Sequence, residues 1–111
     1  MNGSFIDPGA LRSELSLQQA TLTADGLGGH AESWSEVATL FARVEPVSAG
    51  TRFGADQTVE TVTHRITVRF RADLASGMRL AHGGRVFEGV SVHDPDETGR
   101  YLVCRAREKG R

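Results

Sequence analysis

The clearest element of the sequence spans residues 62–70 and reads Val-Thr-His-Arg-Ile-Thr-Val-Arg-Phe. Its residue types alternate at every step. Because successive side chains of a strand point to opposite faces, this alternation predicts a half-buried antiparallel strand. The predicted inner face holds Val62, His64, Ile66, Val68 and Phe70. The outer face is basic and holds Thr61, Thr63, Arg65, Thr67, Arg69 and Arg71.

Shorter patterned segments lie on both sides. Residues 11–22 read as a strand whose apolar phase slips by one between Leu17 and Ala20, which indicates a bulge or strong twist. Further strands are predicted at residues 78–80, 85–93 and 100–107, separated by glycine-containing turns. In the second of these, Val86, Val90 and Val92 share a face with Glu88.

Residues 34–44 fit two patterns. Trp34, Val37, Ala38 and Phe41 have helical spacing, and Ser33 with Glu36 would form a capping box. The even-numbered positions equally form one face of a strand, with β-prone residues opposite. We favour the strand because the neighbouring segments are strands. The chain is therefore predicted to be all-β, a small antiparallel barrel or sandwich of about six strands with a long loop between the second and third.

Size and composition limit the alternatives. The chain has 111 residues, 39% of them hydrophobic, and a formal net charge of −1. This is enough for one domain and gives no strong field toward nucleic acid. Cys104 is the only cysteine, so an intrachain disulfide is excluded and a reducing compartment is indicated. With no run of roughly 20 apolar residues and no signal pattern, we expect a soluble intracellular product without membrane contact.

The predicted organisation has three parts: an N-terminal arm (1–10), a β-barrel domain (11–108, with its loop at 46–60) and a basic tail (109–111). Residues 45–58 show no regular pattern. This segment is long, because the median length of loops in compact domains is about 4–6 residues. Such long loops are often functional. Phe53 inside it either anchors the loop to its own domain or meets a partner.

No catalytic or metal-binding constellation is predicted. Gly26-Leu27-Gly28-Gly29 lacks the spacing and the βαβ context of a dinucleotide loop. The four histidines are scattered, and residues 93–97 lack the ligand count of a calcium loop. Cys104 alternates with Leu102 and Ala106, so it is expected to be buried and inert. We therefore expect no enzyme, no cofactor and no metal.

Arginines on one strand face are the main candidate for contacts with other molecules. Arg65, Arg69 and Arg71 form either an ordinary solvated face, a rim that meets an acidic partner, or the lining of a lumen for nucleic acid. Trp34 and Phe41 are the aromatic residues expected to anchor either the core or a subunit interface.

The order of several short segments resembles one family. They are Gly9-Ala10-Leu11-Arg12, the turn at 25–29, Trp34 followed by residues 40–46, residues 63–70, Met78-Arg79-Leu80, and residues 94–97. From Gly9 to Arg107 the chain resembles the phage head-tail joining proteins, also called head completion, head closure or stopper proteins, including their relatives in gene transfer agents.

That resemblance implies a β-barrel assembled into a ring, with six copies favoured and twelve as the alternative. The ring would lie in the neck of the particle, with the portal or adaptor ring on the head side and the tail terminator or tail tube on the tail side. DNA would pass through its lumen without sequence specificity, and assembly would take place in the bacterial cytoplasm. Rival interpretations are an adaptor or tail-terminator ring of the same neck, or a small nucleic-acid-binding barrel.

In some relatives the long loop after the second strand closes the channel. By this resemblance the gating loop would include Val47, Ser48, Gly50, Arg52, Phe53, Gly54, Asp56 and Gln57.

Deleting residues 48–56 is expected to leave the fold intact and to impair DNA retention or tail attachment, because the loop is long, glycine-containing and outside the strand pattern. The measurement is particle yield together with infectivity or gene transfer. Normal values for both in the deletion variant would reject a functional role for the loop.

Overall fold

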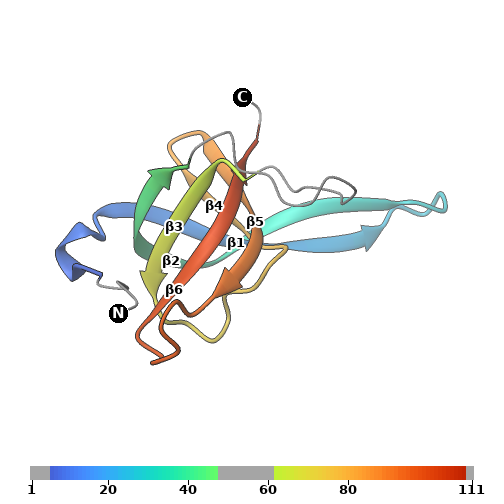
Figure 1. The fold of residues 1–111 in the computed structure, drawn as a ribbon. Coiled ribbons are helices and arrows are strands. Elements are labelled where there is room, and N and C mark those ends of the chain that lie inside the picture. Colours follow the sequence, from blue (N-terminus) through green and yellow to red (C-terminus); the bar gives the residue numbers. More distant parts are fainter. Residues whose placement is uncertain (1–5, 48–61, 110–111) are drawn as a thin grey trace, which may run out of the picture.

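The fold is a closed barrel of six antiparallel strands, seen in a computed structural model that describes residues 6–47 and 62–109 (Figure 1). The strand order around the barrel is β1-β2-β3-β6-β5-β4. The strands are β1 (Ser13–Ala24), β2 (His30–Pro46), β3 (His64–Arg69), β4 (Arg79–His82), β5 (Arg85–His93) and β6 (Tyr101–Glu108). The predicted all-β fold of about six strands is confirmed, and of the two predicted forms the chain adopts the barrel.

The core is built from the inward residues of all six strands and one loop residue. Its buried members are Leu15, Leu17, Leu40, Ala42, Ile66, Val68, Leu74, Leu80, Phe87, Leu102, Cys104 and Ala106. Most of them are medium-sized or small, which suits the narrow interior of a small barrel. Phe87 is the one aromatic residue among these clustered core residues of the described chain.

The ambiguous segment at 34–44 is a strand, as favoured, and forms part of β2. A bulge is present where the sequence predicted a bulge or a strong twist. The register between β1 and β2 shifts between Leu17, which pairs with Ala38, and Gln18, which pairs with Glu36. Val37 is therefore the extra residue of a bulge on β2. The predicted change of apolar phase along β1 does not bring Ala20 and Leu22 to the core, because both are exposed.

Two predicted inner faces need correction. Phe70 is 47% exposed because β3 ends at Arg69 and the chain then turns away from the barrel interior. In β5 the core residue is Phe87, which lies on the face opposite to Val86 and Glu88. A register shift between Gly89 and Ser91 then brings Val92 against the core, so the three valines do not share one buried face.

The outer face of β3 is not uniformly solvated. Arg65 and Arg69 are exposed, as predicted, but Thr67 between them is only 5% exposed. Its cross-strand partner on β6, Val103, is buried as well and lies outside the core cluster. The basic face is therefore interrupted by a covered strip at the middle of β3 and β6.

The first two strands continue beyond the barrel as a two-stranded hairpin (Figure 1). In the ladders of the described residues, β1 pairs with β4 only from Ser16 to Gln18, and β2 pairs with β3 only from Ala42 to Pro46. We call residues 19–35 the hairpin extension. The radius of gyration is 15.4 Å, against about 13 Å for a compact domain of this length, so the chain is more elongated than a simple globule.

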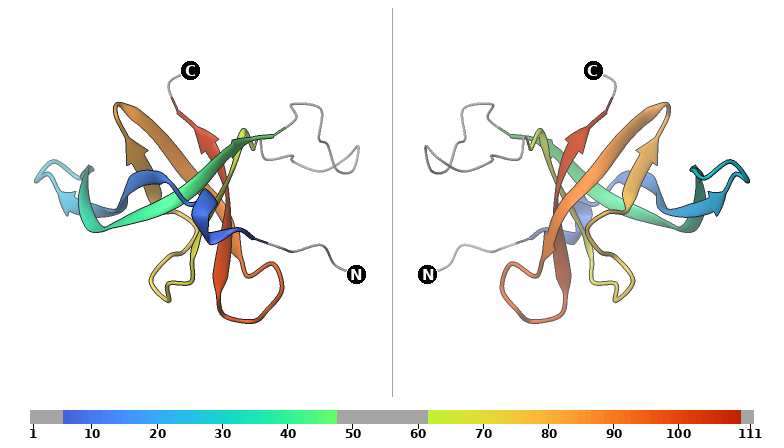
Figure 2. Two further views of the ribbon diagram at one scale, coloured as in Figure 1. Left: turned by 90° about the vertical axis from the view of Figure 1, so that its left-hand side faces the viewer. Right: turned by 90° about the vertical axis from the view of Figure 1, so that its right-hand side faces the viewer.

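The two ends of the barrel carry different loops. Figure 2 shows the β3–β4 loop and the β5–β6 turn together at one end, and the β4–β5 turn near the C-terminus at the other. The tight β4–β5 turn uses Gly83 and Gly84, whose φ angles of 54° and 88° favour glycine. The barrel therefore offers two distinct end surfaces to neighbouring molecules.

The chain around the barrel is only partly described. Within the N-terminal arm, η1 (Pro8–Ala10) is a short 3-10 helix capped by Asp7, which accepts a hydrogen bond from the Gly9 N–H, where a loose arm was expected. After β2, the Val47 N–H donates to the Thr63 carbonyl at 3.0 Å. The other predicted gating residues lie at positions 48–57, outside the described residues. No helix of the described part is long and apolar enough to cross a membrane.

Replacing Ile66 with aspartate is expected to unfold the barrel, because Ile66 is fully buried and an unpaired buried charge costs several kcal/mol of a total stability of about 5–15 kcal/mol. Circular dichroism and thermal melting measure the effect. The control is Ile66→Val, for which a loss of about 0.5–1.5 kcal/mol is expected. A soluble Ile66→Asp variant with the wild-type spectrum and melting temperature would contradict this inward placement.

Candidate functional site

The described residues form surfaces for association with other molecules. Among them, no set of reactive side chains comes together at one point. They contain no cluster of three or more His, Cys, Asp or Glu side chains that could hold a metal ion. Cys104 is buried, as expected, and burial raises the pKa of its thiol to about 11. A thiol with this pKa is protonated at neutral pH and is a poor nucleophile.

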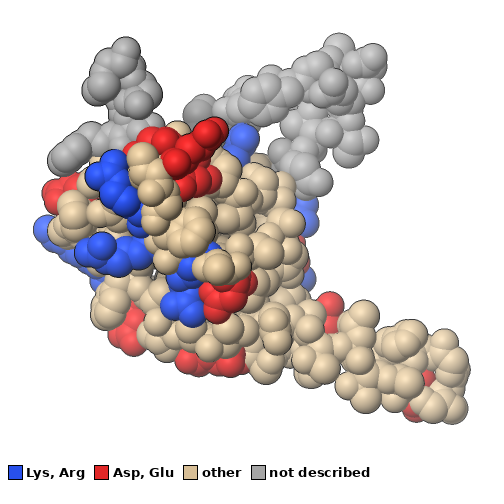
Figure 3. All heavy atoms as spheres, turned by 90° about the horizontal axis from the view of Figure 1, so that it is seen from below, with Lys and Arg blue, Asp and Glu red and all other residues tan. Residues whose placement is uncertain are grey.

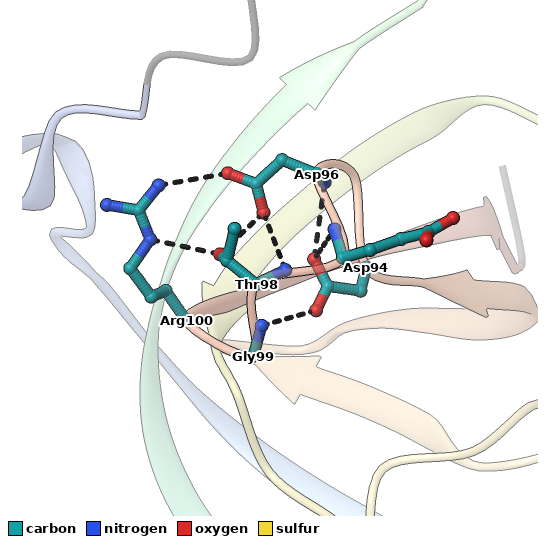
Figure 4. A network of polar contacts seen from close by, with 6 residues as sticks. Asp94, Asp96, Thr98, Gly99 and Arg100 are labelled. Atoms are coloured by element: carbon teal, nitrogen blue, oxygen red, sulfur yellow. Dashed lines mark hydrogen bonds and ion pairs between the residues drawn. The ribbon is translucent and has the colours of Figure 1, made fainter.

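The acidic β5–β6 turn is a self-contained hydrogen-bond network (Figure 4). The Asp94 carboxylate accepts bonds from the backbone N–H groups of Asp96, Glu97 and Gly99. The Asp96 carboxylate accepts from Thr98 and pairs with Arg100 at 3.0 Å. The hydrogen bonds from Thr98, followed by those from Arg100, lower the pKa of Asp96 to about 2. These carboxylates therefore stabilise the turn.

The predicted arginine face is mostly neutralised by neighbouring carboxylates. Arg65 lies 3.3 Å from Glu45 on the adjacent strand, and Arg43 pairs with the same carboxylate at 3.1 Å. Arg71 pairs with Asp73 at 2.9 Å. Exposed pairs of this kind contribute only about 0–1 kcal/mol to stability. Their main effect is to reduce the net positive charge of this face.

The basic C-terminal residues are paired in the same way. The Glu88 carboxylate forms hydrogen-bonded ion pairs with Arg107 at 2.9 Å and with Lys109 at 3.2 Å. These hydrogen bonds, that of Arg107 foremost, lower the pKa of Glu88. Arg85 pairs with Glu108 at 2.8 Å across β5 and β6. Figure 3 accordingly shows blue and red side chains interspersed over the barrel, without one continuous basic patch on that face.

Trp34 lies at the base of the hairpin extension and not in the barrel core. It is half-buried, and the guanidinium of Arg79 lies 4.3 Å from the centre of its ring. Arg79 also donates to the Gln18 side chain at 2.7 Å. This cation–π contact joins β2 to β4 where the extension leaves the barrel. Trp34 therefore serves the local structure, and it is not brought together with the other candidate interface residues.

Phe41, Arg69 and Arg71 come together in a surface groove of about 520 Å³. The groove is lined by η1, the middle of β2 and the end of β3; its residues are Pro8, Leu11, Thr39, Leu40, Phe41, Arg69, Phe70 and Arg71. Phe41 is 57% exposed, so two aromatic side chains, Phe41 and Phe70, face solvent beside two guanidinium groups. Of the residues predicted for an interface, Arg65 and Trp34 do not line this groove.

The hairpin extension is a candidate surface for association that the sequence patterns did not predict. Leu22 is 65% exposed and Leu27, at the tip, is 91% exposed. The predicted glycine turn is present, because Gly26 and Gly28 have positive φ angles and Asp25 accepts bonds from the Leu27 and Gly29 N–H groups. One available signal was the loss of polar–apolar alternation after Leu17, together with the many small side chains.

Comparison with known proteins relates the chain to virion components. The family described as phage head completion protein matches residues 6–109. A chain from the virion of a native gene transfer agent particle is 32% identical, with a TM-score of 0.67, and the match covers 87% of this chain and 93% of that chain. The solution structure of protein SF1141 from Shigella flexneri 2a is 27% identical, with a TM-score of 0.62, and the match covers 91% of this chain and 96% of that chain. No curated protein matches the chain.

His64 gives the barrel a pH-dependent contact. Its ring meets Phe87 edge to face at 5.0 Å, and its Nδ1 lies 2.9 Å from the Thr63 hydroxyl. Burial lowers the pKa of His64 below 6.5; Glu108 acts in the opposite direction and Arg85 in the same direction. The unfolded chain therefore takes up this proton at a higher pH than the folded chain does.

The contribution of His64 to stability is thus complete above about pH 6.5 and falls as the pH drops toward the folded-state pKa. The urea midpoint of the wild type is expected to be lower at pH 5.5 than at pH 7.5. His64→Gln should reduce this difference, whereas His93→Gln, at an exposed position, should keep it. An unchanged pH dependence in His64→Gln would assign the effect to other groups.

Proposed function

The chain belongs to the phage head completion protein family, and from this premise we propose that it closes the DNA-filled head and joins it to the tail. At the coarser level it is a structural head–tail protein of a phage or gene transfer agent particle. The proposal is that it acts as a stopper, a ring between the portal or its adaptor and the tail.

The match over residues 6–109 is the observation that carries this proposal, because it includes every strand of the barrel. The similar chain comes from the virion of a gene transfer agent particle, which supports a structural role in such a particle. Membership in a family of structural virion proteins speaks against an enzymatic role. The burial of Cys104 and the use of Asp94 and Asp96 within their own turn agree with that conclusion.

The architecture suits a ring component, and the family resemblance favours six copies, with twelve as the alternative. A closed barrel leaves few unpaired edges, and its two ends carry different loops that can meet different layers of the neck (Figure 2). A ring repeats one head-to-tail interface by rotation, which needs two complementary surfaces on each copy. The groove and the hairpin extension are two such surfaces.

The charge distribution agrees with DNA that passes through the lumen of the ring and is not bound tightly by the barrel. A protein that binds DNA tightly neutralises phosphates with free Lys and Arg side chains and releases counterions. Here Arg65, Arg71 and Arg107 are paired with carboxylates. This pairing favours a neck component over a small barrel that binds nucleic acid by itself. The gating loop, including Phe53 and residues 48–57, is part of the proposal through the family resemblance alone.

The test is a deletion of the gene in the producing bacterium, followed by electron cryomicroscopy of the particles. We expect tail-less heads that lose their DNA, and restoration of tailed particles when the wild-type gene is supplied. In restored particles the chain should form a ring between the portal layers and the tail. A ring that lies between the portal and another protein ring of the neck would instead indicate an adaptor, and normal tailed particles without the chain would reject the proposal.

A further inference from the structure

We propose that the tip of the hairpin extension of one copy docks into the groove of the next copy around the ring. The occupant of the groove is thus a second copy of this chain, bound through Leu22 and Leu27. This inference rests on the proposed ring, and it goes further by assigning the two surfaces that join its subunits.

The hairpin extension has the composition of a segment that is covered in its working state. Every described side chain from Gln19 to Gly28 is exposed, including both leucines. A two-stranded hairpin with no third strand is only marginally stable in water. Exposed large apolar side chains at a projecting tip lower their free energy when a partner buries them.

The groove offers the complementary surface. It combines the half-exposed rings of Phe41 and Phe70 with the apolar side chains of Pro8 and Leu11. Its volume of about 520 Å³ has room for apolar side chains of a hairpin tip. Aromatic residues beside arginines are the composition that protein interfaces favour at their centres.

The charges of the two surfaces are opposite. From residue 19 to residue 35 the hairpin extension contains Asp25 and Glu32 and no Lys or Arg, and Figure 3 shows the extension without blue side chains. The groove carries Arg69 and Arg71, and Arg71 is paired with Asp73. Among the ion pairs of the described residues none involves Arg69, whose guanidinium lies 6.0 Å from the centre of the Tyr101 ring. An acidic tip therefore meets a basic groove, which favours this pairing over tip-to-tip contact.

The positions of the two surfaces also fit. In Figure 1 the tip of the hairpin lies on one side of the barrel and η1, which lines the groove, lies on the opposite side. A copy cannot place its own tip in its own groove in this arrangement. A knob and a groove on opposite sides make a heterologous contact, and such contacts build rings when the rotation closes.

Cross-linking between two introduced cysteines tests this contact. The variant carries Ala24→Cys beside the tip and Thr39→Cys in the lining of the groove, both at exposed positions, so that Leu27 and Phe41 are kept. The native Cys104 is buried and does not compete. Treating purified particles and the purified chain with a short bis-maleimide is expected to give a ladder of covalent multimers up to the ring size. The matched control, Ala24→Cys with Ser76→Cys on an exposed loop, should give no ladder.

A second pair of variants measures the contribution of each surface. Leu27→Asp and Phe41→Asp should each weaken subunit association by about tenfold or more, and circular dichroism should show an unchanged fold. Ser76→Asp adds the same charge elsewhere and should associate as the wild type does. Association is measured by sedimentation of the purified chain and by the number of copies retained per particle.

The outcomes separate the two proposals. If the wild type forms a ring and neither the ladder nor the loss of association is seen, the docking inference is wrong while the neck function stands. If the Ala24→Cys variant cross-links only to another neck protein, the tip docks on a different layer and the inference is again wrong. If the wild type forms no ring in solution or in particles, the proposed function itself fails, and the docking inference fails with it.

Discussion

Closure of the barrel depends on a short ladder between β1 and β4. Its residue pairs are Ser16 with Ala81, Leu17 with Leu80, and Gln18 with Arg79. Both leucines are almost fully buried, so this seam is also part of the core. Without it the sheet would be open, with unpaired edges on β1 and β4 that invite association with other strands. The hydrogen bond from Arg79 to the Gln18 side chain reinforces the last pair of the seam.

The same short ladder creates the hairpin extension. Because β4 spans only Arg79–His82, β1 has no partner other than β2 after Gln18 in the described structure. The bulge at Val37 lies at this point, and Arg79 stacks on Trp34 beside it. The first half of β1 thus closes the barrel, and its second half projects from the barrel as part of the hairpin extension. The core can be optimised for folding while the projecting part is free to serve association.

Ion pairing gives the outer surface its character. Carboxylates accompany most of the arginines that line β3, β5 and β6, so the surface carries many charges and little net charge. Such pairs add little to stability, but they limit the number of phosphates that the surface could neutralise. In the proposed ring this property allows DNA to move past the subunits. Subunit association would then depend on apolar contacts, as at the centres of most protein interfaces.

Local periodicity in the sequence is sufficient to predict the fold class and the inner face of most strands. The alternation from His64 to Val68 follows from the two-residue period of a strand, which any sheet must satisfy. Tertiary structure alone decided which strand lies beside which, and hence where a strand leaves the barrel. Phe70 reads as a core residue in the pattern, yet it faces solvent because β3 ends one residue earlier. The groove joins η1, β2 and β3, and Leu27 is a tip residue only because β4 is short. These features depend on pairings between residues far apart in the chain, which local periodicity does not encode.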